Sequence, residues 1–173
     1  INSCETIEVF YNIRTDLDKL KYAAHITKIV NDVTDENQNT YRILQLLLNT
    51  LYVISETDKN LDLVLSVFRL RLLCIMGFKP IVNKCSVCGQ NDKIRFFSIQ
   101  DNCVKCESCG RADKSAITMN ITTYDTIRYI SSVEAKKIFS FDIPEESIKE
   151  LDLITKIYLN EKLEKEYKLE DLW

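Results

Sequence analysis

Apolar side chains recur at spacings of three and four residues along the first part of the chain. The row over residues 5–33 consists of Ile7, Phe10, Ile13, Leu17, Leu20, Ala24 and Val30. A row with this spacing covers one face of an α-helix. We therefore predict one long amphipathic helix over residues 5–33, or a broken pair of helices. The polar stretch 34–39 should then form a turn and supply the next N-cap.

Two further helices are predicted with short connections between them. The helical period runs over residues 40–55 and, after a polar link at 58–60, over residues 61–76. The second of these is apolar on nearly every side, which indicates a central helix buried by its neighbours. Gly77 and Pro80 should end it, because glycine accepts the backbone conformation that follows a helix and proline has no N–H to continue one. Three helices joined in this way favour a bundle.

The helical period disappears between residues 79 and 115 and returns after them. Within this stretch only Ile94–Phe97 has the pattern of a strand. A further helix is predicted over residues 124–130, with Thr122 or Thr123 as its N-cap. The middle stretch is therefore an insertion between helices.

A last helix is predicted from Pro144, which suits a first-turn position, toward Leu163. Glu145 and Glu146 follow the proline, where the helix dipole favours acidic side chains. The apolar positions on this helix are Ile148, Leu151, Ile154 or Thr155, Tyr158 and Leu159. A small insertion cannot cover them, so we expect the last helices to pack back onto the first three.

The composition agrees with a mainly helical fold. The chain has 173 residues with only 3 glycines and 2 prolines, too few for the tight turns of an all-β protein. No apolar run approaches the roughly 20 residues that a membrane span needs, and no leader pattern opens the chain. We expect a soluble, intracellular protein with no membrane contact. Since the first residue is Ile1, we also expect a processed chain or a fragment.

The cysteines carry the clearest chemical signal. Five of the seven lie between residues 85 and 109, and four of them form two C-x2-C pairs separated by seventeen residues: Cys85, Cys88, Cys106 and Cys109. This spacing is typical of a four-thiolate zinc site, and a shell closed by four thiolates points to one structural Zn²⁺ per chain. Gly89 and Gly110 directly follow the two pairs, and we expect both to adopt a positive φ in a knuckle turn.

Cys103 overlaps the second pair, because it lies three residues before Cys106. Gly110 favours Cys106 and Cys109 as the ligands, while the extra thiol leaves Cys103 as an alternative. A disulfide network and a redox C-x-x-C motif are weaker explanations, since the cysteine count is odd and no βαβ pattern surrounds the pairs. Cys4 and Cys74 fit small core residues.

Little in the chain points to catalysis. His25 is the only histidine, and no glycine-rich elbow or phosphate loop accompanies it. We expect His25 on a helix surface or half-buried, and we expect the protein not to be an enzyme. The predicted fold is mainly α: a helical bundle formed by residues 1–78 and 116–173, with a small zinc ribbon inserted at residues 79–115.

Charge separates the ribbon from the rest of the chain, although the whole chain has a net charge of −3. Residues 79–115 hold seven basic and four acidic groups, and four thiolates with one Zn²⁺ would reduce their net charge to about +1. That field is too weak to indicate strong nucleic-acid binding, which rests on several phosphate contacts.

The order of these features resembles one bacterial family, the recombination mediator RecO. The likeness lies in residues 7–24 (IEVFYNIRTDLDKLKYAA), Phe68–Leu73 (FRLRLL), Gly77–Pro80 (GFKP), Cys85–Gly89 (CSVCG), Phe97-Ser98, Cys106 and Cys109. It covers nearly the whole chain. Two features depart from the family: Asn102-Cys103 stands where many relatives have two glycines, and the acidic balance is unlike that of a DNA-binding protein.

The resemblance implies a cytoplasmic, nucleoid-associated protein of DNA repair and recombination. Family members anneal single strands and load the recombinase together with RecR. They also bind the acidic, Phe-ended C-terminal tail of single-strand-binding protein at an apolar and basic site on the helical domain. DNA contacts would come mainly from an N-terminal oligonucleotide-binding barrel, to which nothing here corresponds, so the chain resembles the C-terminal portion of a member.

Arg69 and Arg71 are our candidates for partner binding, and the alternative is that such arginines pair with buried carboxylates. Two other function classes stay open. One is a general zinc-ribbon module for protein or nucleic-acid interaction, and the other is an enzyme subunit in which the zinc knuckle is a structural element.

Overall fold

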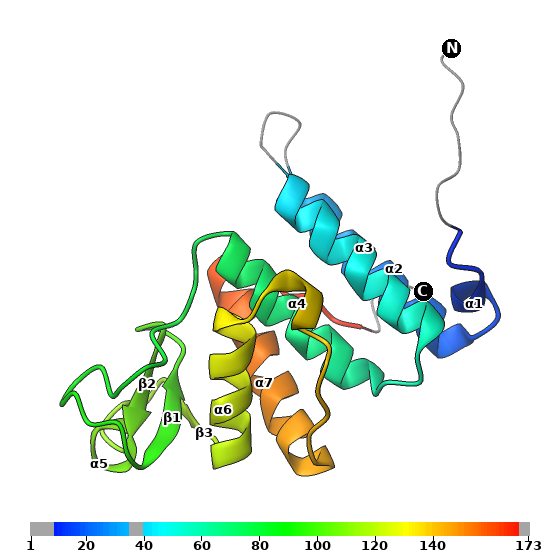
Figure 1. Cartoon of the computed structure of the whole chain (residues 1–173). Helices are drawn as coiled ribbons and strands as arrows, with labels where there is room; N and C mark the ends of the chain where they lie inside the picture. The colour runs from blue at the N-terminus through cyan, green and yellow to red at the C-terminus, as the bar shows by residue number, and fades with distance from the viewer. Residues whose placement is uncertain (1–8, 35–39, 170–173) are drawn as a thin grey trace.

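The computed structural model of the chain describes residues 9–34 and 40–169 (Figure 1). In chain order its elements are α1 (Tyr11–Arg14), α2 (Leu17–Val33), α3 (Tyr41–Glu56), α4 (Leu61–Ile75), β1 (Ile94–Ser98), β2 (Cys103–Cys106), α5 (Glu107–Gly110), β3 (Ala116–Thr118), α6 (Ile121–Ser132), the 3₁₀ turn η1 (Ala135–Lys137) and α7 (Glu145–Leu163). The predicted mainly helical fold with a small inserted ribbon is confirmed.

The first predicted helix is a broken pair. α1 is a single turn that follows Phe10, which has a φ of 47°. Asp16 then starts α2 as its N-cap, because its carboxylate accepts hydrogen bonds from the backbone N–H groups of Asp18 and Lys19. Residues 5–8 of the predicted helix, with Ile7, lie outside the described residues, as do residues 35–39 of the predicted turn.

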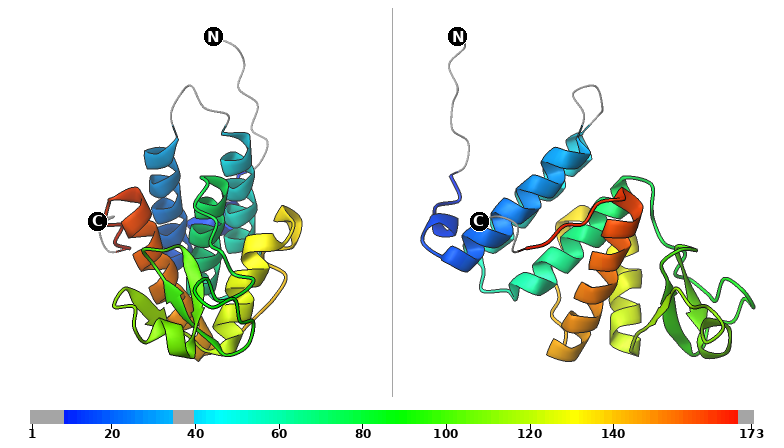
Figure 2. Two further views of the ribbon diagram at one scale, coloured as in Figure 1. Left: turned by 90° about the vertical axis from the view of Figure 1, so that its left-hand side faces the viewer. Right: turned by 180° about the vertical axis from the view of Figure 1, so that it is seen from behind.

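Helix α4 is the centre of the molecule. Its N-cap is Asn60, whose side chain accepts a hydrogen bond from the N–H of Leu63 at 3.1 Å, and every residue from Leu63 to Leu70 is buried. Figures 1 and 2 show α4 between the α2–α3 hairpin and the α6–α7 pair, and its contacts agree. Gly77, with a φ of 98°, ends it as the sequence predicts.

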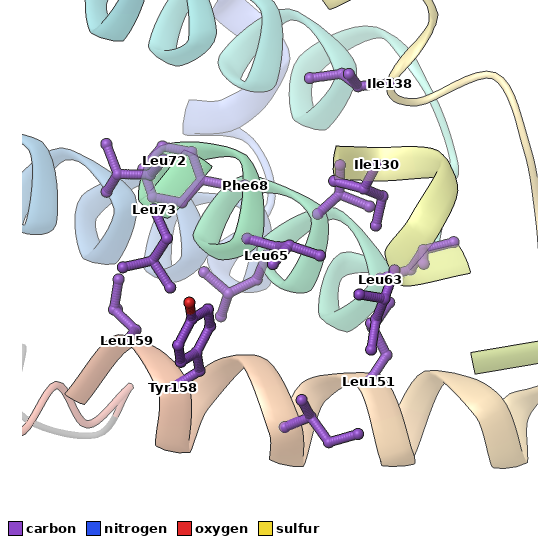
Figure 3. Close-up of a cluster of buried hydrophobic side chains, with 14 of the residues drawn as sticks. Leu63, Leu65, Phe68, Leu72, Leu73, Ile130, Ile138, Leu151, Tyr158 and Leu159 are labelled. Atoms are coloured by element: carbon purple, nitrogen blue, oxygen red, sulfur yellow. The ribbon is translucent and has the colours of Figure 1, made fainter. Parts of the chain in front are cut away.

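Helix α7 packs back onto α4, which confirms the prediction for the last helix. Figure 3 shows Leu151, Tyr158 and Leu159 of α7 facing Leu65 and Leu73 of α4. The helix starts one residue later than predicted, since Pro144 is its N-cap, with a ψ of 149°, and not a residue of the first turn.

The start of α6 differs from the prediction in a similar way. Its N-cap is Asn120, and not Thr122 or Thr123, because the side-chain Oδ1 of Asn120 accepts a hydrogen bond from the N–H of Thr123 at 2.9 Å. Thr123 is buried in the first turn, where its hydroxyl donates to Glu150 of α7 at 2.8 Å. The side chain of Thr123 is therefore used to join α6 and α7.

The ribbon is a three-stranded antiparallel sheet with the strand order β2-β1-β3. Strand β1 was predicted from the sequence, while β2 and β3 were not. The sheet rests against the end of the bundle, where the rings of Phe97 and Tyr158 form a T-shaped pair with their centroids 5.1 Å apart. The hydroxyl of Tyr124 also donates to the carbonyl of Val82 at 3.0 Å. One continuous hydrophobic core thus runs from the ribbon into the helices.

Candidate functional site

Four thiols meet within the ribbon. The sulfur atoms of Cys85, Cys88, Cys106 and Cys109 all lie within 4.8 Å of one another. The Sγ atoms of Cys88 and Cys106 are 3.7 Å apart. Four sulfurs at about 2.3 Å from a central ion in a tetrahedron stand about 3.8 Å from each other. The arrangement therefore has the size that a tetrahedral metal ion requires.

The first pair sits on a turn built from backbone hydrogen bonds. The N–H of Gly89 donates to the carbonyl of Cys85 at 2.9 Å, and the N–H of Cys85 donates to the carbonyl of Gln90 at 2.7 Å. Gly89 has a φ of 77°, as predicted for a glycine that closes a knuckle. This turn places Cys85 inside, at 1% exposure, and Cys88 at the surface.

The second pair is held differently. Cys106 is the last residue of β2 and the N-cap of α5, and Cys109 lies in that short helix. Gly110 is also helical and has no positive φ, so the predicted second left-handed glycine is wrong. A side chain at Gly110 would overlap the ring of Phe96, so this glycine is needed for close packing between α5 and β1.

The thiols influence one another electrostatically. Burial alone would raise the pKa of Cys85, but N–H groups of Cys106, Cys88 and Val87 lower it to about 6. The pKa of Cys109 is raised to about 12, first by its hydrogen bond with Cys106 and then by burial. A cluster in which one thiol ionises readily and another resists ionisation is a good site for a cation, which removes the repulsion between thiolates.

Cys103 lies outside this cluster. It is buried, and its sulfur is 3.0 Å from the hydroxyl oxygen of Ser86. Burial is the largest influence on its thiol and raises the pKa. The residue before it, Asn102, has a φ of 54°, a left-handed conformation that asparagine tolerates better than most residues.

Two cations of the ribbon are held by carboxylates of the same segment. Lys105 is 6% exposed and its ammonium lies 2.5 Å from Asp101 and 2.8 Å from Asp113. These hydrogen bonds raise the pKa of Lys105, so it stays charged inside a neutralising pair of carboxylates. Arg111 forms an ion pair with Glu107. Two of the seven cations of residues 79–115 are thus already neutralised within the chain.

Arg69, the first candidate for partner binding, is a buried side chain. Only 3% of it is exposed, and its guanidinium donates to Asp152 of α7 at 2.6 Å. Burial lowers the pKa of Arg69, and Asp152 opposes that effect. The pairing with a carboxylate that the sequence offered as the alternative is present.

Arg71, the second candidate, faces an open hollow that we call the α3–α4 notch. The notch has two adjoining parts of about 230 and 220 Å³ that share Arg42, Arg71 and Ile75. Its remaining lining consists of Gln45, Leu46, Asn49, Cys74, Lys79, Ser131, Ser132, Glu134, Ala135 and Ile138. The guanidinium of Arg71 is anchored by donating to the carbonyl of Ile130 at 3.0 Å.

Sequence reasoning missed Arg42 and Lys79 as partners of Arg71 in this notch. Arg42 lies on the polar side of α3 and Lys79 follows the end of α4, so only the packing of three helices brings them together. Cys74 also lines the notch, half-buried, and burial raises the pKa of its thiol. Cys4 lies outside the described residues.

His25 is buried at 1% exposure, so the predicted surface or half-buried position is wrong. It lies on the side of α2 that faces the core, between Ala23 and Ile26. No helix in the part of the chain that the structure describes is both long and apolar enough to cross a membrane.

Comparison with known proteins bears on the same features. A family described as "Recombination protein O C terminal" matches residues 14–170, which include both the helices and the ribbon. The chain belongs to the RecO family. This confirms the resemblance drawn from the sequence.

Three curated members of the RecO family illustrate the likeness, and each is named "DNA repair protein RecO". The protein of Acetivibrio thermocellus is 41% identical over 169 residues, which are 96% of this chain and 67% of that protein. That of Alkaliphilus metalliredigens is 29% identical, over 92% of this chain and 65% of its own length. That of a Thermoanaerobacter species is 28% identical, over 99% and 69%. The chain therefore spans about two thirds of the length of these relatives.

Proposed function

We propose that this chain is the helical and metal-binding portion of a mediator of DNA repair and homologous recombination. It acts with RecR and with single-strand-binding protein to load the recombinase and to anneal complementary strands. This role is non-enzymatic. Support comes from membership of the RecO family and from relatives named for DNA repair.

In this proposal the four thiols hold one structural Zn²⁺. Zinc fits because the sulfur spacing suits a tetrahedral ion and because thiolates alone close the coordination shell. Bound zinc would cross-link the first knuckle to β2 and α5. Its role is then to hold the parts of the ribbon together, with no open position for chemistry.

The α3–α4 notch is the observation that supports single-strand-binding protein as a partner. An acidic peptide that ends in Phe needs an apolar surface for the ring and cations for its carboxylates. The notch supplies Leu46, Ile75 and Ile138 beside the guanidinium groups of Arg42 and Arg71. Glu134 also lines it, so the acidic side chains of the peptide should lie nearer Lys79 than Glu134.

Strong DNA binding is assigned to the part of the relatives that this chain does not match. The chain has a net charge of −3, and Lys105 and Arg111 are paired within the ribbon. The acidic balance of the chain disfavours the several phosphate contacts on which affinity for DNA depends. The chain by itself should bind single strands weakly.

A side-by-side titration tests this function. A labelled acidic, Phe-ended peptide from single-strand-binding protein should bind, while a labelled oligonucleotide at the same salt should bind weakly. Arg42→Glu should abolish peptide binding, and Arg95→Glu, an exposed change on β1, should not. Tight DNA binding without peptide binding would instead favour a zinc-ribbon module that reads nucleic acid.

A further inference from the structure

Helix α3 exposes a row of large apolar side chains, which we call the α3 stripe. Tyr41, Leu44, Leu48 and Tyr52 are 66%, 49%, 45% and 55% exposed. At 3.6 residues per turn these four positions fall within about 80° of arc, so they form one continuous row along the helix. Single exposed apolar side chains are ordinary, but several gathered on one face mark an interaction surface.

The α3 stripe faces away from the core. The buried residues Ile43, Thr50 and Ile54 lie on the opposite side of the helix. Among the described residues, the main neighbours of α3 are α1, α2 and α4. Figure 1 shows the α2–α3 hairpin on the outside of the molecule, apart from the ribbon. This position leaves the stripe accessible to another molecule.

The composition of α3 also differs from that of an ordinary solvent-exposed helix. Of its 16 residues only two are charged, Arg42 in the first turn and Glu56 at the last position. The outer face of a surface helix usually carries charged side chains. The core of a protein interface is instead depleted of charge and enriched in tyrosine. The outer face of α3 therefore has the composition of an interface.

The α3 stripe is complementary to a second copy of itself. Two α3 helices can lie antiparallel across a twofold axis at Leu48, so that Leu48 meets its own copy. Leu44 of each chain then faces Tyr52 of the other. At a rise of 1.5 Å per residue, Arg42 lies about 9 Å before Leu48 and Glu56 about 12 Å after it. Arg42 and Glu56 of the other copy are thus offset by only about 3 Å along the helix axes.

The two charges also lie on the same flank of the stripe, so the twofold axis brings opposite charges together at both ends. Arg42 and Glu56 are exposed, and neither forms an ion pair within the part of the chain that the structure describes. Glu56 accepts hydrogen bonds from the neutral side chains of Asn12 and Ser55. A parallel pair of helices would set like charges at the same height, so charge complementarity favours the antiparallel pair.

We propose that two copies of this chain associate through the α3 stripe, antiparallel and twofold-symmetric, with Leu48 at the axis and Arg42 paired with Glu56 of the other copy. The four side chains of the stripe expose on the order of 450 Å² per copy, about half of what a stable complex buries on each partner. The dimer is therefore weak and reversible.

The dimer has a consequence for the α3–α4 notch. Arg42 lines that notch, so dimer formation engages a cation that the acidic peptide needs. Dimer and peptide should then compete for the chain. This competition rests on the proposed function, whereas the dimer itself does not.

Sedimentation velocity of the whole chain tests the dimer. Between about 5 and about 500 µM, the weight-average sedimentation coefficient should rise from that of a monomer toward that of a dimer. Leu48→Glu should abolish the rise, because it places two carboxylates together at the axis, and Leu48→Lys should do the same. The control Leu153→Glu, at a 50% exposed leucine on α7, should behave like the parent chain.

Mixing the two variants tests the symmetry. An equimolar mixture of Leu48→Glu and Leu48→Lys should associate again, because a residue at the twofold axis meets its own copy. Arg42→Glu should weaken the dimer about tenfold, and the further change Glu56→Arg should restore it. Peptide binding should stay lost in this double variant. Peptide binding by the double variant would contradict the proposed function and leave the dimer standing.

Three outcomes would overturn the dimer. The first is a monomer at every concentration, which would leave the stripe to a different partner. The second is a dimer that persists in Leu48→Glu, and the third is a mixture of the two Leu48 variants that stays monomeric. Circular dichroism shows whether the Leu48 variants fold. If they do not, the exchange of charge between Arg42 and Glu56 decides, and a dimer that neither Arg42→Glu nor the double variant changes would overturn the proposal.

Discussion

Gly89 and Gly110 hold the same position after their cysteine pairs, but two different physical constraints require them. Gly89 has a φ of 77°, which a side chain makes costly, and nothing crowds it. Gly110 has an ordinary helical backbone, and the Phe96 ring occupies the place of a side chain. A motif that repeats in the sequence therefore does not repeat in the structure.

Gly110→Ala should destabilise the ribbon by about 1–3 kcal/mol, because the new methyl group must displace Phe96 from its contact with α5. Chelator titration of the metal-loaded chain followed by circular dichroism measures the effect. Ser108→Ala, an exposed change in the same short helix, is the control. Equal resistance of both variants to the chelator would contradict the role given to Gly110.

The metal assignment has its own test at this scale. Protein prepared without chelators should contain one Zn²⁺ per chain, and Cys106→Ser should lose it, because its sulfur lies 3.7 Å from Cys88 within the cluster. Cys103→Ser should keep full zinc content, since that sulfur contacts Ser86 outside the cluster. Elemental analysis decides, and zinc loss in Cys103→Ser would show a different ligand set.

Tyr158 should make stability depend on pH at the alkaline end. Burial raises its pKa above the ordinary value near 10, and its hydroxyl donates to the carbonyl of Phe78 at 2.7 Å. A raised folded-state pKa contributes stability that is complete below about pH 10 and is lost as the pH rises past it. Denaturant unfolding at about pH 8 and about pH 10.5 should show a smaller loss in Tyr158→Phe than in the parent chain. Tyr52→Phe, at an exposed tyrosine, should behave like the parent.

At the scale of elements, the sequence predicted the bounds of a helix well where a single local pattern determined them. The bounds of α3 and α4 came within one residue of the prediction, because their apolar period and the Gly77 stop are local signals. The caps of α6 and α7 were misplaced, since Thr122, Thr123 and Asn120 are all good N-caps and tertiary contacts with Glu150 select Asn120.

The candidate site likewise has a part that local sequence patterns predicted and a part that they did not. Local spacing indicated the four cysteines that the structure brings together, because each pair lies on one turn. The short strands β2 and β3 gave no usable period, since β2 is buried at every position and β3 has three residues. Arg42 of the notch and the pairing of Arg69 with Asp152 join residues far apart in the chain, so no local pattern could indicate them.

A substitution in the ion pair between Arg69 of α4 and Asp152 of α7 tests how these two helices pack together. Asp152→Asn should cost about 2–4 kcal/mol, because it leaves the buried Arg69 cation without its carboxylate, and the partial exposure of Asp152 keeps the loss from being larger. Urea unfolding measures the change. Glu145→Gln breaks an exposed pair with Lys149 and should change stability by less than about 0.5 kcal/mol. Similar losses in both variants would contradict the buried role of Arg69.

At the scale of the whole molecule, the ribbon is joined to the bundle by apolar packing as well as by the chain. Phe97 and Val82 belong to the same core as the helices, and their partners are Tyr158 and Tyr124. Leu65 and Leu73 form part of the bundle core at the α4–α7 contact, as Figure 3 shows, and none of the four thiols takes part in that contact. Metal binding should thus stabilise one end of a molecule whose helices hold together independently.

Removal of the metal should unfold residues 80–115 while most of the helical signal remains. Far-UV circular dichroism should keep its helical minima after chelation, and hydrogen exchange should rise in the ribbon and around Tyr124 and Tyr158, where the ribbon is docked. Collapse of the whole spectrum to coil on chelation would show that ribbon and bundle unfold as one unit.

The burial of α4 on nearly every side sets the order of events during synthesis. Its main partner, α7, begins at Glu145, 70 residues after the last residue of α4 at Ile75. At about 5–20 residues per second, a ribosome needs several seconds to make that interval. Throughout this time the face of α4 that Leu151 and Tyr158 will cover is exposed on a growing chain. A nascent chain of this kind is a substrate for chaperones, and a slow codon within residues 76–144 would lengthen its exposure.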